Sequence, residues 1–336
     1  QPENTIDAII NFVTTKSVAR ESNVNVPANT TSSVLKKTLK EAGFDDVFSE
    51  VYHDEKLDLI KPYQLRLFQL NVVDNAFSFD ALKKFLLRNI GQYIYSRERI
   101  KKFDADDETT LIGLKAVELL RDRCNGDLTW LGDELGDLML YVFLEQILDA
   151  PKVFSKFETR SNGLLTTGAS CVHLLQPDAR TPSFQMVFGK SRIVGDPKDA
   201  IDDAFITLEA IKDDTSREMR IIESTALDRE FTPEVANYLK DIILPSKGKK
   251  ISHDTAFGIF LGYSLGLDAN KYTSVEFARN LESKMKLDIR SHVSYIADKI
   301  KAAGMERYSF YFYFLPLNDA DSEKQSIMQS ILRGGV

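Results

Sequence analysis

Apolar and polar positions alternate along residues 64–73, QLRLFQLNVV, and this period of two predicts a β-strand. From Ser78 onward, apolar positions recur every three or four residues, which predicts an amphipathic helix. Residues 35–42 predict a shorter, lysine-bearing helix that ends at Gly43, because glycine is common just after a helix. These patterns favour an α+β region over residues 1–125.

The pattern changes after a turn at residues 124–127, CNGD. Residues 131–148 predict a long helix that is almost continuously apolar in its second half and therefore buried. Residues 169–175 and 184–193 are short and rich in β-branched and aromatic residues, which predicts a hairpin. Residues 198–212 again show a helical period. The order helix, strand, strand, helix indicates an α/β (α+β) fold.

The rest of the chain is predicted to be mostly helical over residues 213–303. Residues 308–314, YSFYFYF, predict a late aromatic strand, and residues 321–332 predict a final helix. We expect two domains, an N-terminal region over residues 1–125 and a second domain over residues 126–336. The late strand is expected to return and pair with the N-terminal sheet.

Charge limits the classes of function. The chain has 336 residues, with 43 Lys and Arg against 50 Asp and Glu, and a formal net charge of −7. This balance argues against a protein that coats nucleic acid by bulk charge, although it does not exclude a local basic groove. Lys247, Lys249 and Lys250 lie in a basic loop, PSKGKKISHD, and are candidate phosphate contacts.

Targeting signals and metal-binding cysteine patterns are missing from the sequence. No apolar run approaches the roughly 18 residues that span a membrane, and the first residues do not resemble a signal peptide. Cys124 and Cys171 do not have the spacing of zinc ligands, and a reducing compartment is the simplest interpretation. We therefore expect a soluble, cytoplasmic protein with no membrane partner.

The order of elements over residues 131–212 resembles a restriction-endonuclease-like core. In that fold a helix carboxylate, a strand aspartate and a strand Glu-x-Lys meet at one edge of a sheet. The carboxylates hold Mg²⁺, which activates water for phosphodiester hydrolysis. The resemblance implies a mixed sheet flanked by helices, with its site near the hairpin.

Four segments narrow the resemblance to one family: GDELGDLMLYVFLEQILDAPKVFSKFE, GASCVHLL, FQMVFGKSRIVGDPKDAIDDAF and FYFLPL. They resemble the HamA family, which includes the related AbpA proteins of phage defence. The resemblance implies an effector of the Hachiman anti-phage system, a metal-dependent DNA nuclease that works with a helicase partner, HamB. It also implies that Mg²⁺ is the family's cofactor.

The family's site residues carry over onto this chain with substitutions. Where the family reads Gly-x-Asp-Gly-x-His, this chain reads GASCVH, so Ser170 replaces the aspartate. Where the family reads Gly-Glu-x-Lys, this chain reads GKSR, so Lys190 and Arg192 replace the glutamate and the lysine. Glu134 matches the helix glutamate, and Asp137 stands one turn later. The strand positions therefore carry two positive charges where the family carries a net negative one.

We expect Ser170, Lys190 and Arg192 to lie in one cluster that faces Glu134 and binds no Mg²⁺. Glu134 and Asp137 are only weak metal candidates by themselves, because Mg²⁺ prefers several anionic oxygens. Lys190 and Arg192 are candidate nucleic-acid contacts, together with the three lysines of the basic loop. The leading hypothesis is a HamA-like defence subunit with a helicase partner and a lost metal site.

Two alternatives remain open. The first is an active DNA nuclease that uses Glu134, Asp137 and further ligands that the comparison with the family pattern misplaces. A shifted register, with Asp178 in a Pro-Asp pattern that precedes Lys190, is one way to supply such a ligand. The second is a regulatory subunit that binds only DNA or a partner protein. His173 is expected to be a packed histidine rather than a ligand, and Asp202 and Asp203 are expected to solvate a helix face.

Overall fold

The computed structural model describes residues 35–53, 55–155, 157, 168–177, 183–213, 227, 231–243 and 252–334. All of them belong to one of two structural units of the chain, Leu35–Val336. In this part of the chain, no helix combines the length and the apolar character that crossing a membrane requires.

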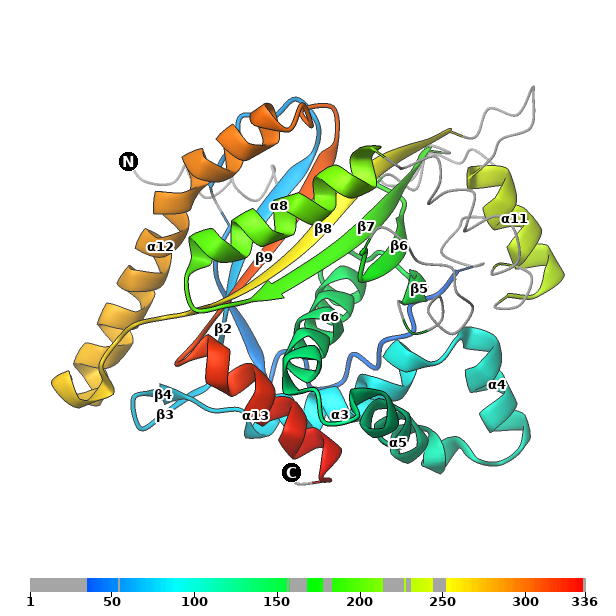
Figure 1. Cartoon of the computed structure of the whole chain (residues 1–336), viewed down its shortest axis with the longest axis horizontal. Helices are drawn as coiled ribbons and strands as arrows, with labels where there is room; N and C mark the ends of the chain where they lie inside the picture. Colours follow the sequence, from blue (N-terminus) through cyan, green and yellow to red (C-terminus); the bar gives the residue numbers. More distant parts are fainter. Residues whose placement is uncertain are drawn as a thin grey trace, which may run out of the picture. The chain divides into compact units, whose positions relative to one another are not determined.

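Seven strands form one mixed sheet in the order β1-β2-β9-β8-β7-β6-β5 (Figure 1). The neighbours from β2 to β7 pair in parallel, whereas β1, β6 and β5 join in antiparallel register. The strands are β1 (Phe48–Tyr52), β2 (Tyr63–Leu70), β5 (Lys152–Ser155), β6 (Cys171–Leu175), β7 (Ser183–Ile193), β8 (Ser252–Ser264) and β9 (Ser309–Leu317). A separate hairpin consists of β3 (Val72–Val73) and β4 (Ala76–Phe77).

Helices cover both faces of this sheet (Figure 1). On one face lie α3 (Asp80–Ile94), α5 (Ile112–Cys124), α6 (Leu128–Gln146) and α13 (Ala320–Leu332). On the other face lie α8 (Pro197–Asp213) and α12 (Ser274–Ala302). The remaining helical segments are α4 (Arg97–Ala105), η1 (Thr109–Leu111), α11 (Pro233–Ile243) and η3 (Ala269–Lys271). The predicted α/β class is confirmed as a mixed seven-stranded sheet flanked by helices.

Helix α6 is the centre of the hydrophobic core, and every residue from Glu134 to Glu145 is buried. The ring of Phe143 contacts aromatic rings from four strands and one loop. Its ring partners lie 4.8–5.9 Å away between centroids, and they are Phe44, Phe48, Phe68, Phe260 and Tyr313. Such pairs add about 0.5–1.5 kcal/mol each beyond the area that they bury. The predicted buried helix is therefore confirmed.

Two strand glycines let α6 approach the sheet closely. A Cβ atom on Gly258 would lie 2.7 Å from Cδ2 of Leu144, and one on Gly189 would lie 2.8 Å from Cδ2 of Leu140. Real Cβ atoms do not reach such distances, so these glycines set the spacing between the helix and the strands.

The predicted hairpin and the predicted late strand are both present, whereas β8 was not predicted. β6 and β7 pair in antiparallel register, and β9 lies between β8 and β2. The prediction that residues 213–303 are mostly helical was wrong for β8, which crosses the middle of the sheet. Strands from both sides of residue 125 share this sheet.

The predicted helix over residues 35–42 is absent, because this segment hydrogen-bonds to side chains instead. The amides of Thr38 and Leu39 each donate to Oε2 of Glu145 at 2.6 Å. Oε1 of Glu145 accepts from the Thr38 hydroxyl at 2.9 Å and from the amide of Lys152 at 2.7 Å. This buried carboxylate therefore fixes the segment to the end of α6, since hydrogen bonds to a charged group are strong.

Lys152 and His173 are polar residues that the core nevertheless accommodates. The Nζ atom of Lys152 donates to the carbonyl oxygens of Gln92, Tyr93 and Tyr95 at 2.9–3.2 Å, which satisfies the end of α3. Opposite Lys152 in the sheet, the Nδ1 atom of His173 donates to the carbonyl oxygen of Ala150 at 2.7 Å. His173 is thus a packed histidine.

We predict that Gly258→Ala destabilises the protein, because its new methyl group must displace Leu144. Overpacking of this kind costs about 1–3 kcal/mol. The matched control is Gly113→Ala in α5, where the nearest atom lies 3.7 Å from the new Cβ and helix propensity favours alanine by about 1 kcal/mol. Urea unfolding should move the two midpoints in opposite directions. Equal midpoints for both variants would contradict the close packing of α6.

We also predict a pH dependence of stability that originates from His173. Burial, aided by the charges of Lys152 and Arg97, lowers the pKa of His173 from 6.5 to about 3. The unfolded chain binds this proton near pH 6.5 and the folded chain only near pH 3. Unfolding therefore takes up a proton between these values, and the free energy of unfolding falls as pH falls, by at most about 1.4 kcal/mol per pH unit.

The measurement is the slope of the unfolding free energy between pH 6.5 and acidic pH. His173→Gln should flatten this slope, whereas His53→Gln, at a side chain that is 64% exposed, should leave it unchanged. The same slope in His173→Gln as in the parent protein would contradict this assignment.

Candidate functional site

The predicted site residues lie around the start of α6 and the end of β7. Asp127 begins α6, since its side chain accepts a hydrogen bond from the amide of Trp130 at 3.0 Å. Asp133, Glu134 and Asp137 follow in the first turns of this helix. Glu134 and Asp137 are buried, with exposed fractions of 1% and 5%, whereas Asp133 is partly exposed.

Glu134 points into the core between α6 and α3. Its Oε2 atom accepts a hydrogen bond from the hydroxyl of Tyr93 at 3.2 Å. Burial raises the pKa of Tyr93 well above 10, and the neighbouring carboxylates of Glu134 and Asp137 raise it further. Tyr93 is therefore a neutral hydrogen-bond donor to Glu134 at physiological pH.

Asp137 contacts the middle residue of the GKSR motif. The hydroxyl of Ser191 donates to Oδ1 of Asp137, and both side chains are buried. Successive residues of a strand point to opposite faces of the sheet. Since Ser191 faces α6, strand alternation turns Lys190 and Arg192 away from the face that carries Glu134 and Asp137. From the sequence we expected Lys190 and Arg192 to face Glu134. In the structure, Lys190 and Arg192 lie on one face of the sheet and Glu134 lies on the other.

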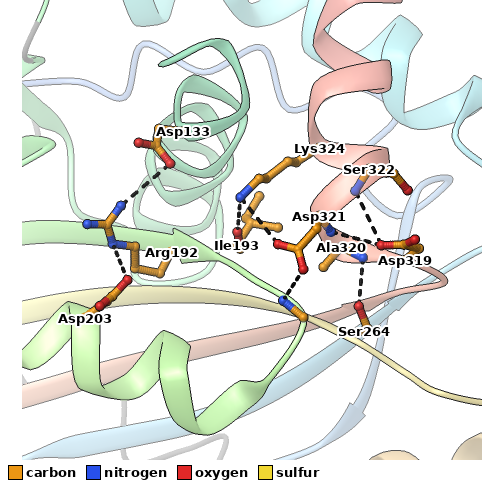
Figure 2. Close-up of polar contacts among 11 residues, drawn as sticks. Asp133, Arg192, Ile193, Asp203, Ser264, Asp319, Ala320, Asp321, Ser322 and Lys324 are labelled. Carbon is orange, nitrogen blue, oxygen red and sulfur yellow. Dashed lines mark hydrogen bonds and ion pairs between the residues drawn. The ribbon is translucent and has the colours of Figure 1, made fainter. Parts of the chain in front are cut away.

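Among the described residues, Arg192 lies beyond the paired part of the edge that β7 shares with β6. The pairing of β6 with β7 ends at Cys171 and Gly189, so no residue of β6 stands opposite Arg192. From this edge, Nη1 of Arg192 lies 3.6 Å from Oδ1 of Asp133 on α6. Nε of Arg192 lies 3.7 Å from Oδ2 of Asp203 on α8, so the guanidinium stands between the two carboxylates (Figure 2).

Ser170 and Lys190 lie beside each other where the pairing of β6 with β7 ends. The amide of Ser170 donates to the carbonyl oxygen of Gly189 at 2.8 Å, next to Lys190 in the chain. The Nζ atom of Lys190 lies 3.4 Å from the carbonyl oxygen of Gly168. Ser170 is buried, and within the described ranges its hydroxyl has no hydrogen-bond partner.

The N-terminal turn of α13 holds the ends of β7 and β8 in place (Figure 2). The Nζ atom of Lys324 donates to the carbonyl oxygen of Ile193 at 2.7 Å. Asp321 accepts from the amide of Gly195 at 3.2 Å, and the amide of Ala320 donates to the Ser264 hydroxyl at 2.9 Å. These contacts fix the position of Arg192, which directly precedes Ile193.

The residues that the sequence resemblance assigns to the family's metal positions do not fit Mg²⁺, which prefers hard anionic oxygens. Ser170 offers a neutral hydroxyl, and Lys190 and Arg192 bring positive charges. The carboxylates of the helix are already engaged: Asp133 pairs with Arg192, Glu134 accepts from Tyr93, and Asp137 accepts from Ser191. Among the described residues, no group of three or more His, Cys, Asp or Glu side chains is placed to hold a metal.

Asp133 and Asp203 are the site residues that sequence reasoning missed. The family pattern pointed to Glu134 as the helix carboxylate, but Asp133 is the one that lies near Arg192. Asp203 was expected to solvate a helix face, and it pairs with Arg192 instead. No sequence pattern indicated either contact.

Some predicted residues lie outside the described ranges. They are Asp178, Lys247, Lys249 and Lys250. Their roles remain predictions from the sequence.

Comparison with known proteins identifies the family. The family model HamA matches residues 45–331, which include the sheet, α6 and the whole Arg192 region. No curated protein and no solved structure matches the chain. The match covers most of the chain, and so the chain belongs to the HamA family of anti-phage defence proteins.

Proposed function

We propose that this chain is a defence subunit of HamA type that has lost the metal-dependent nuclease chemistry of a restriction-endonuclease-like site. One observation carries the proposal: Arg192, which the sequence resemblance assigns with Lys190 to the family's strand positions, is paired with Asp133 and Asp203. A divalent cation at this edge would meet two fixed positive charges and would compete with Arg192 for the same carboxylates.

A site of this charge is suited to a phosphate rather than to a metal. Lys190 and Arg192 lie on one face of β7, and both side chains are partly exposed. A guanidinium held 3.6–3.7 Å from two carboxylates is not consumed by short hydrogen bonds to them. The Arg192 side chain is partly exposed, and phosphate oxygens are common partners of arginine.

A partner protein supplies what this chain lacks. The net charge of −7 gives poor affinity for long nucleic acids, since binding requires Lys and Arg against successive phosphates. The sequence also contains no Gly-x-x-x-x-Gly-Lys-Ser/Thr motif for nucleotide binding. A helicase partner would provide both the basic track and the coupling to nucleotide hydrolysis.

The second candidate is an active nuclease that uses the acidic residues of α6. Asp133, Glu134 and Asp137 lie within two turns of this helix, so one helix supplies three carboxylates. The burial of Glu134 and Asp137 argues against this candidate, because two of the three carboxylates are turned into the core. Cleavage of plasmid DNA by the unmodified chain with Mg²⁺ or Mn²⁺, abolished by Asp133→Asn, would establish it.

We predict that Ser170→Asp, Lys190→Glu and Arg192→Lys together introduce metal-dependent DNA cleavage. The triple change releases Asp133 and Asp203 from the guanidinium and adds two carboxylates at the same edge. Each single change should stay inactive, since the residues of such a site act as a unit. Plasmid nicking with Mg²⁺ is the measurement. A triple variant that folds and binds metal yet leaves plasmid intact would contradict an ancestral nuclease site.

We further predict that the isolated chain binds duplex DNA only weakly and in a salt-sensitive way. Fluorescence anisotropy at physiological salt should give a Kd in the micromolar range or weaker, and Arg192→Ala should weaken binding further. Lys301→Ala, at an exposed position near the end of α12, is the matched control. Co-expression with a helicase encoded beside its gene should yield a complex on size exclusion. A monomer that binds DNA with nanomolar affinity would contradict the proposal that a partner protein supplies most of the DNA binding.

A further inference from the structure

The side chain of Arg192 is held between two helices that lie on opposite faces of the sheet (Figure 2). Asp133 belongs to α6 and Asp203 belongs to α8. The pairing of β6 with β7 ends before Arg192, so the guanidinium lies near both helices at the edge of β7. Two carboxylates from separate elements therefore compete with any external anion for one cation.

Both ion pairs are weak by their geometry and by their exposure. Their N–O distances are 3.6 and 3.7 Å, longer than the distances of about 2.7–2.9 Å that are typical of hydrogen bonds between charged groups. The side chains of Asp133 and Asp203 are 43% and 47% exposed, and solvent screens pairs of this kind. A phosphate that offers better acceptors can therefore displace them.

The guanidinium also has a hydrogen bond that it does not form in this position. Its Nε atom is buried, and among the described residues no acceptor is hydrogen-bonded to it. A buried donor without an acceptor costs free energy, because it has lost water and gained no partner. The Arg192 side chain is nevertheless 28% exposed, so other atoms of it reach the surface. Movement of the guanidinium toward a phosphate would thus sacrifice little.

A purely structural link between α6 and α8 explains these contacts less well. The helix α8 is already fixed to the sheet by buried apolar side chains such as Phe205 and Leu208, which are at most 1% exposed. Two long, screened ion pairs add little to such packing. A structural arginine in the same protein has a different geometry, since Arg66 donates to both oxygens of Glu50 at 2.6 Å.

We propose that Asp133 and Asp203 form an inhibitory contact within the chain, which lowers the affinity of the β7 edge for phosphate. The inference rests on the proposed function, in which Arg192 binds a phosphate of DNA. Without DNA, the two carboxylates hold the guanidinium. A phosphate must take their place and must also approach two negative charges, and both effects oppose binding. Removal of either carboxylate is therefore expected to strengthen DNA binding.

The experiment measures binding of the full chain to a short labelled DNA duplex by fluorescence anisotropy. Asp133→Asn and Asp203→Asn keep the shape of the side chain and remove its charge. Each should strengthen binding about twofold to fivefold, because a unit charge at ion-pair distance near the surface has an effect of about this size. The charge-matched controls are Asp106→Asn and Asp298→Asn, at exposed positions outside this contact, and salt should make their effect smaller.

Arg192→Ala tests whether the gain depends on the guanidinium. In the parent chain, this change should weaken DNA binding. In a chain that already carries Asp133→Asn and Asp203→Asn, it should weaken binding by a larger factor, because the guanidinium is there no longer held by carboxylates. Urea unfolding of every variant checks that the fold is kept.

Two results would overturn the inhibitory contact. One is a gain from Asp133→Asn and Asp203→Asn that is no larger than the gain from the controls. The other is a gain that persists in full after Arg192→Ala, since the carboxylates would then only repel DNA through space. In either case, weaker binding by Arg192→Ala in the parent chain would leave the proposed phosphate contact intact. If Arg192→Ala changes DNA binding in neither background, that phosphate contact is itself wrong, and the inhibitory contact with it.

Discussion

The burial of α6 against the sheet is the constraint on which the other elements depend. Phe143 alone contacts rings from β1, β2, β8 and β9, so the helix links strands that lie far apart in the sequence. Gly189 and Gly258 keep the helix at the distance that these contacts need. The buried carboxylate of Glu145 extends the same constraint to the segment that precedes β1.

The packing of α6 against the sheet also determines which carboxylates of this helix lie near the end of β7. A helix buried over nearly its whole length must turn some of its polar residues into the core, and Glu134 and Asp137 occupy such positions with Tyr93 and Ser191 as partners. Asp133 lies one residue earlier on the exposed side and is therefore the residue that Arg192 can approach. A shift of one position along a helix changes the direction of the side chain by about 100°, which is why Asp133 lies near Arg192 and Glu134 does not.

The sequence predicted those elements whose periodicity was unambiguous, such as α6, the β6–β7 hairpin, α8 and β9. It failed at β8, where the run AFGIFLGYSL is apolar on both faces because the strand is central and covered by helices on both sides. Such a run has no period of two and resembles a buried helix. The prediction of a helix over residues 35–42 was wrong for another reason. Hydrogen bonds to Glu145, a residue more than a hundred positions away, override the helical composition of this segment. The same applies to Asp203, whose pairing with Arg192 exists only in the folded chain.

The position of β9 has a consequence for biosynthesis. This strand lies between β2 and β8, and residue 63 pairs with residue 310. During translation, β1 and β2 emerge long before β9 and cannot join the rest of the sheet until β9 has left the ribosome. Their edges stay open to other chains for that time, and pairings between such distant segments are slow to form. A nascent or truncated chain that ends before β9 is thus expected to need chaperone protection, whatever the stability of the completed fold.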